Sequence, residues 1–291
     1  MSDYLEEMPV GSADQVSLFA PDPQAPLVKP PGEAAVRMRV LITVKAAPNP
    51  SETYGETVCV AGIRLDDGQG GWVRLYPINF RELESDRTFR KYEIVSLQAK
   101  PNRADPRAES FRPIIDTIKR ERFIRGWDRR LPFIIDHVHA SMCEVRAAVR
   151  ERPPARSLAA IRPRLVQGLD IEPHPGWTRD EQAKIDRYVA QGDLFDQRPR
   201  TALEAPRFKG WYRYLCQSGD CRGHRQGIYD WEWVALQRRF RHLDDADLKA
   251  LLHERFFDMM CGAGKDTIFY VGNQAKHQLT FMVLGACYPT R

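Results

Sequence analysis

The fold of the N-terminal half follows from Thr57-Val58-Cys59-Val60-Ala61-Gly62-Ile63-Arg64-Leu65, which Asp66-Asp67-Gly68-Gln69-Gly70-Gly71 connects to Trp72-Val73-Arg74-Leu75-Tyr76-Pro77-Ile78. The two outer segments are rich in β-branched and aromatic residues, which are enriched in strands. Aspartate and glycine dominate the connecting segment, and both residues favour turns. The stretch therefore predicts two antiparallel strands joined by a tight turn.

Segments with the same character lie on both sides of this pair. Residues 38–44 and 92–99 are rich in valine, isoleucine and leucine and predict two more strands. Residues 80–91 between them predict a short helix or an irregular link. Four short strands in one region favour a small antiparallel sheet or barrel.

Helical periodicity begins after this region. Apolar residues at three- and four-residue spacing predict a helix over 123–150, which Pro153 and Pro154 end. Residues 158–171 predict one further strand, weakened by Pro163. Thr178, with Glu181 three residues later, predicts a capped helix over 178–190.

The C-terminal part alternates strands and helices around a Cys/His turn. Residues 208–215, 267–271 and 280–286 predict strands, and Asp230 and Asp244 predict the N-caps of two helices. The fold class predicted is α+β, with a β-rich N-terminal half and a C-terminal α+β Cys/His module. The expected segments are a disordered tail over 1–35, a β-rich domain with a helix over 36–175, a helix and linker over 176–206, and the Cys/His module over 207–291.

Composition limits the class of protein. The chain has 291 residues, 43% hydrophobic and 29% charged, with a net charge of +5, so it contains a substantial core. No apolar run reaches the roughly 18 residues of a membrane span, and the acidic N-terminus does not resemble a signal peptide. We therefore expect a cytoplasmic protein. The mild positive charge is compatible with an anionic partner such as nucleic acid, although charge alone favours an ordinary surface.

A metal site is predicted around one turn. Cys216, Cys221 and His224 present three soft or borderline ligands at short spacing, as zinc sites do. The fourth ligand is not local, and His277 is the first candidate. Further candidates are Cys261, Cys287 and Asp220. Zinc in a closed site would stabilise the fold, zinc in an open site would activate water, and reduced cysteines without metal are the alternative.

Two pentapeptides share the pattern Gln-x-(Ser/Asp)-Leu-Phe. The first contains Gln15, Leu18 and Phe19 and lies in the proline-rich tail. The second contains Gln191, Leu194 and Phe195 and follows a predicted helix. Both resemble the short peptide with which bacterial replication and repair proteins bind the DNA polymerase sliding clamp. This resemblance covers only the pentapeptides, and it implies the sliding clamp as a partner.

One such peptide binds weakly. Burial of a leucine and a phenylalanine contributes roughly 3–6 kcal/mol, whereas a micromolar complex needs about 8 kcal/mol. Two peptides could act together on a ring with repeated pockets. The second peptide has a structural alternative, because its Leu-Phe pair could pin the end of the preceding helix to the core.

Two further sets of residues are candidates for catalysis and for nucleic-acid binding. The catalytic set is Asp230, Glu232, Lys265 and His277, but it lacks the separated aspartate and Glu-x-Lys of a restriction-type nuclease. The nucleic-acid set is Trp72, Arg74, Tyr76 and Arg81, aromatic and basic residues suited to single strands. Strand alternation sends Trp72, Arg74 and Tyr76 to one face, which is also what an ordinary two-sided sheet shows.

The sequence therefore favours an accessory protein of DNA replication, repair, mobile-element or defence biology that binds the sliding clamp and contacts nucleic acid. A metal-dependent nuclease or other nucleic-acid-processing enzyme is the first alternative. A non-catalytic regulator or toxin that blocks the clamp is the second. The sequence does not decide whether the protein is an enzyme.

Overall fold

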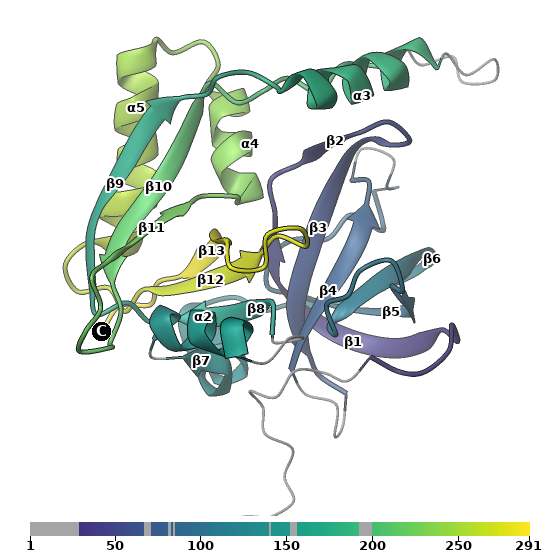
Figure 1. Ribbon diagram of the computed structural model, residues 1–291, viewed down its shortest axis with the longest axis horizontal. Helices are drawn as coiled ribbons and strands as arrows, with labels where there is room; N and C mark the ends of the chain where they lie inside the picture. The colour runs from purple at the N-terminus through teal and green to yellow at the C-terminus, as the bar shows by residue number, and fades with distance from the viewer. Residues whose placement is uncertain are drawn as a thin grey trace, which may run out of the picture.

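The computed structural model describes residues 29–66, 71–80, 83, 85–139, 141–151, 156–191 and 200–291. Helices and strands are both abundant in these ranges, which confirms the predicted α+β class. Figure 1 shows the N-terminal half, in purple and blue, beside the C-terminal half, in teal, green and yellow. No helix in these ranges combines the length and apolar character that crossing a membrane requires.

A closed five-stranded barrel forms the N-terminal half. Its strands are β1 (Val36–Lys45), β3 (Gly55–Arg64), β4 (Gly71–Ile78), β5 (Glu93–Pro101) and β6 (Ser110–Phe123), with the short β2 (Asn49–Ser51) beside β3. The hydrogen-bonded order β1-β5-β6-β4-β3 returns to β1, because β1 pairs with both β5 and β3. All these pairs are antiparallel except β4 with β6. The predicted small barrel is confirmed, and the structure adds a parallel pair.

The barrel closes where β1 changes partners. Its first half pairs with β5 and its second half with β3. Gly62 of β3 lies at this crossing, where a Cβ atom would be 2.2 Å from the carbonyl oxygen of Leu41. Only glycine permits so close an approach of the two backbones.

The C-terminal half repeats this pairing with different strands. They are β7 (Val138–His139), β8 (Leu158–Ile161), β9 (Leu165–Pro173), β10 (Phe208–Leu215), β11 (His224–Gly227), β12 (Ile268–Asn273) and β13 (Phe281–Cys287). Antiparallel pairs join β9 to β10, β10 to β11, β12 to β13, and β12 to β8. A parallel bridge between Ile228, just after β11, and Val283 of β13 links the sheet β11-β10-β9 to the sheet β13-β12-β8-β7, and we call this ring of strands the second barrel. The short β7 pairs with β8.

The strands of the two halves are therefore paired in the same order. In each, an interrupted or bent first strand pairs with the second and fourth strands, and the third and fifth strands run parallel. This Greek-key circuit is that of the OB fold. Residues 158–173, which the sequence analysis groups with the N-terminal domain, supply the first strand of the second circuit.

Helices lie mainly in the C-terminal half. They are α1 (Trp127–Arg130), the 3-10 turns η1 (Leu131–Phe133) and η2 (Ile135–His137), α2 (Met142–Glu151), α3 (Arg179–Ala190), α4 (Trp231–Arg239), α5 (Asp245–His253), the π-turn η3 (Glu254–Asp258) and α6 (Met259–Cys261). The caps predicted at Thr178, Asp230 and Asp244 are confirmed. The single continuous helix predicted over 123–150 is wrong: the segment divides into α1, η1, η2, β7 and α2, because it holds Gly126 at φ 79° and Pro132 at the start of η1.

Three large apolar clusters and a smaller one around Leu41, Ile94 and Ile124 form the core of the described residues. One fills the first barrel and includes Val73 and Leu75 of β4, and another fills the second around Tyr212. The third lies between the halves and contains Trp72 and Tyr270. Each half therefore has its own apolar core, and a buried apolar interface joins the two halves.

Candidate metal centre

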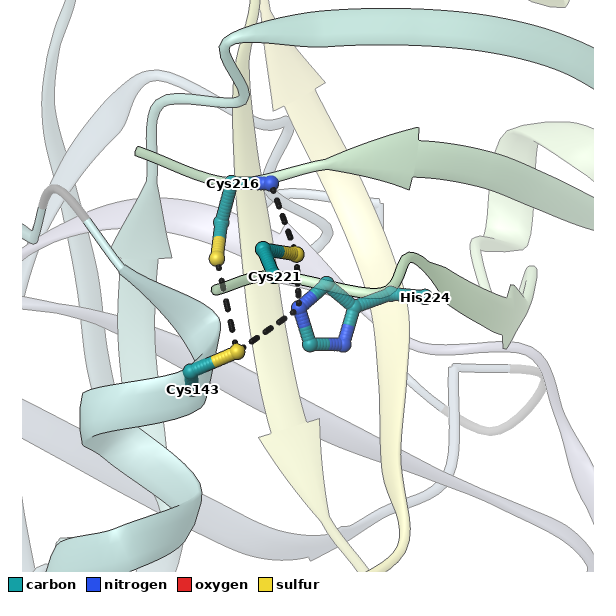
Figure 2. Close-up of side chains that lie close together, drawn as sticks. All are labelled: Cys143, Cys216, Cys221 and His224. Carbon is teal, nitrogen blue, oxygen red and sulfur yellow. Dashed lines mark hydrogen bonds between the residues drawn. The ribbon is translucent and has the colours of Figure 1, made fainter. Parts of the chain in front are cut away.

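Four side chains of metal-ligand type converge at one end of the second barrel. The ligand atoms of Cys143, Cys216, Cys221 and His224 all lie within 4.8 Å of one another. Figure 2 shows the three sulfur atoms and the imidazole facing a common point. The cluster could hold a metal ion.

Three of the four ligands come from one hairpin. Cys216 follows the last residue of β10, Cys221 lies in the connection, and His224 begins β11. The hairpin register places His224 opposite Tyr214, and the two rings pack with centroids 5.1 Å apart. The strand pairing therefore brings residues eight positions apart in sequence (216 and 224) to one site and holds the imidazole against an aromatic face.

The fourth ligand comes from a distant helix. Cys143 is the second residue of α2, whose first turn is stabilised by Ser141 Oγ accepting a hydrogen bond from the Glu144 N–H at 3.2 Å. The same Ser141 hydroxyl lies 3.4 Å from Cys216 Sγ. The N-terminus of α2 carries a partial positive charge, which favours thiolates beside it.

The predicted fourth ligand, His277, is not in this cluster, and neither are the other candidates. His277 lies in the turn between β12 and β13, where its N–H donates to Gln274 O. Cys261 Sγ contacts Phe256 O, and Cys287 is buried in β13. Cys143 was missed because a lone cysteine in an amphipathic helix gives no local signal of ligation.

The spacing of the ligand atoms fits a tetrahedral ion. Cys143 Sγ lies 3.6 Å from Cys216 Sγ and 3.5 Å from His224 Nε2, and Cys221 Sγ lies 3.4 Å from the same Nε2. Zinc bonds to sulfur and nitrogen predict tetrahedral edges of about 3.8 Å and about 3.6 Å. These three edges fit an ion with shifts of a few tenths of an ångström, and all four ligand atoms lie within 4.8 Å of one another.

The electrostatics favour one thiolate before any ion binds. Burial raises the pKa of Cys216, but hydrogen bonds, first that from Ser141, outweigh it and lower this pKa to about 5. Burial and the neighbouring Cys216 raise the pKa of Cys143 to about 12. The Cys216 N–H also points at Cys221 Sγ at 3.4 Å. A bound cation would supply the charge that lets all three thiols ionise.

The catalytic candidates are placed elsewhere. Asp230 accepts the Glu232 N–H as the cap of α4, and Lys91 Nζ bonds both carboxylates at 2.8 and 3.1 Å. Lys265 Nζ donates to Thr290 Oγ1. Within the described ranges, none of these residues belongs to a group of three or more metal-ligand side chains.

The nucleic-acid candidates do not form an exposed face. Trp72 and Arg74 are 7% and 4% exposed, because the second barrel covers the outer face of β4. Arg74 donates to Ser157 Oγ at 3.0 Å across this interface, and Tyr76 pairs with Thr57 Oγ1. Arg81 lies outside the described residues. The predicted alternation of side chains is observed, but both faces of the strand are used for packing.

The clamp-binding candidates fall mostly outside the described residues. These are Gln15, Leu18, Phe19, Leu194 and Phe195. Gln191 is described and forms the C-cap of α3, where its N–H donates to Arg187 O.

The fold and the Cys/His cluster define a two-barrel protein with a candidate metal centre. Residues 138–291 match the family described as Domain of unknown function (DUF8757), and since this match covers more than half of the chain, the chain belongs to that family. Residues 36–136 match a second family, described as Domain of unknown function (DUF8758). No curated protein matches the chain. The two matched ranges correspond to the two strand circuits.

Proposed function

We propose that this protein binds single-stranded nucleic acid and works in DNA replication, repair, mobile-element or defence biology. The observation that carries the proposal is the strand circuit that occurs twice in one chain. OB folds bind oligonucleotides and oligosaccharides. Of these two ligands, the oligonucleotide is a polyanion, and the net charge of +5 favours it.

A binding measurement tests this proposal directly. Fluorescence anisotropy with a labelled 12-nucleotide single strand should show saturable binding that weakens as salt rises, because bound phosphates release counterions. The matched duplex should bind more weakly. No binding of the single strand at low salt would refute the proposal.

The metal proposed for the Cys/His cluster is zinc, in a structural role. Three cysteines and one histidine form a closed tetrahedral ligand set, which leaves no coordination position for water or substrate. When bound, zinc would fix α2 to the β10–β11 hairpin. This ligand set does not favour the alternative of a zinc-dependent nuclease.

A nuclease that uses other metals has a separate test. Asp230 and Glu232 both pair with Lys91, so neither carboxylate is available as observed. An assay with magnesium and manganese on single strands and duplexes decides this alternative. Cleavage lost on Asp230→Asn would establish it.

We also propose docking on the DNA polymerase sliding clamp. The first peptide, Gln15 to Phe19, supports this proposal, because little else in its proline-rich segment accounts for a Leu-Phe pair. Calorimetry with purified clamp is the test, comparing the chain with Leu18→Ala/Phe19→Ala and Leu194→Ala/Phe195→Ala variants. Unchanged binding in both double variants would refute docking. Growth arrest on expression that depends on Phe19 would favour the clamp-blocking regulator.

A further inference from the structure

A cavity of about 340 Å³ lies between the two halves of the molecule. The ends of β1 and β6, the residues before β5 and helix α1 form one side of it. The first turn of α4 and the end of β13 form the other. Five aromatic and four cationic residues line it, against the single acidic residue Glu232.

The positive charge of this cavity is not fully compensated. Lys91 is paired with Asp230 and Glu232, at 2.8 and 3.1 Å. Lys45 instead has its Nζ 3.8 Å from the centre of the Phe80 ring and donates to a backbone carbonyl. Arg130 Nε also donates to a backbone carbonyl. Among the described residues, neither Lys45 nor Arg130 forms an ion pair with a carboxylate. The cavity can therefore accept an anion.

Its aromatic side chains form a supported platform. The Trp127 ring packs against Tyr92 and Tyr288, with centroids 5.3 and 4.9 Å apart. The Arg130 guanidinium lies over Tyr92 and Trp127, at 4.0 and 4.7 Å. Trp231 faces the cavity from α4. Rings held this way bind a flat ligand at little cost in conformational entropy.

We propose that this cavity binds a nucleotide, with aromatic side chains against the base and Lys45 and Arg130 beside the phosphate. This inference rests on the proposed nucleic-acid function and locates its site. Stacking combined with cation pairing is how proteins hold single strands without reading their sequence. The volume suits one unit, either a free mononucleotide or one nucleotide of a strand.

The test uses the full chain and two probes. Anisotropy with a fluorescein-labelled 12-mer of deoxythymidine reports the strand, and tryptophan quenching by deoxythymidine monophosphate reports the free nucleotide. The variants are Trp127→Ala and Arg130→Gln. The matched controls are Trp211→Ala and Arg225→Gln, a stacked pair 4.3 Å apart on the outer face of the second barrel. Thermal unfolding shows that each variant is folded.

We expect Trp127→Ala and Arg130→Gln to weaken strand binding about 5- to 150-fold, and the controls to stay within about twofold of wild type. If the control variants weaken strand binding and the cavity variants do not, the proposed site is overturned, whereas the proposed function still stands. If the mononucleotide quenches the fluorescence, only the cavity variants abolish this quenching, and no strand binding is seen, then the site is supported and the strand-binding function is refuted. Failure of both probes with wild type would overturn both.

Discussion

Replacing Cys143 by serine tests the metal centre at the ligand that only the tertiary structure supplies. The serine hydroxyl retains a polar atom at this position but is a poor zinc ligand. We expect wild type to retain about one zinc ion per chain and Cys143→Ser to retain little. The fold should persist, because each half keeps its own apolar core.

The size of the effect follows from the cluster geometry. Two thiolates 3.6 Å apart, as at Cys143 and Cys216, would repel by about 5 kcal/mol at an effective dielectric constant of about 20. The metal-free cluster must therefore hold protons, and zinc binding should release them. Free zinc at a thousandfold excess over its Kd contributes about 4 kcal/mol of stability. For a chain of this length that is a Tm difference of roughly 8 °C.

Two measurements decide the outcome. Metal analysis of the purified protein gives the stoichiometry, and thermal unfolding with and without a strong chelator gives the Tm difference. Cys261→Ser is the matched control, since Cys261 lies in the same half outside the cluster and its Sγ contacts Phe256 O and Thr267. Equal zinc content and equal chelator response in Cys143→Ser and Cys261→Ser would refute the assignment. So would wild-type protein that fails to bind added zinc.

Three further predictions test other parts of the molecule. Glu109 accepts hydrogen bonds from both the backbone N–H and the hydroxyl of Ser157 across the buried interface between the halves. Ser157→Ala should therefore lower the free energy of unfolding, measured in urea, by about 1–3 kcal/mol, and a loss below about 0.3 kcal/mol would contradict this. Burial, with the charge of Lys91, lowers the pKa of Lys45 to about 8, although Glu232 and Glu93 oppose the shift. Lys45 therefore loses its charge as pH rises through this value, and the affinity for a single strand should fall about tenfold between pH 7 and 9.5. Lys45→Arg should flatten this pH profile. An equally steep profile in that variant would show that Lys45 is not the group responsible. Phe19→Ala should weaken clamp binding at least about tenfold by calorimetry, and an unchanged Kd would exclude the first peptide.

The N-terminal strands were predictable because their signals are local. The β-branched and aromatic residues of β3 and β4 and the turn residues between them predict strands without knowledge of the partner strand. Strand β6 was missed because its sequence is charged and contains Pro113, and much of it faces solvent. Its place is fixed by pairing with β5 and β4, which closes the barrel. Barrel closure is a non-local property that residue patterns alone do not encode.

The candidate metal site likewise has a part that local sequence predicts and a part that it does not. Cys216, Cys221 and His224 were predictable from spacing, since one hairpin brings them together. Cys143 joins them only because α2 packs beside that hairpin, and this contact spans 73 residues of sequence. The cavity of Lys45, Trp127 and Trp231 likewise draws on both halves.

The sequence by itself determined the α+β class, the capped helices and the short spacing of three of the four candidate ligands, because each depends on neighbours within a few residues. Only the tertiary structure decided that the two halves share one strand circuit. It also decided that Trp72 and Arg74 are buried and that cationic and aromatic residues from both halves meet in one cavity. These features depend on which surfaces pack together, and packing is set by the free energy of the whole chain rather than by any one segment.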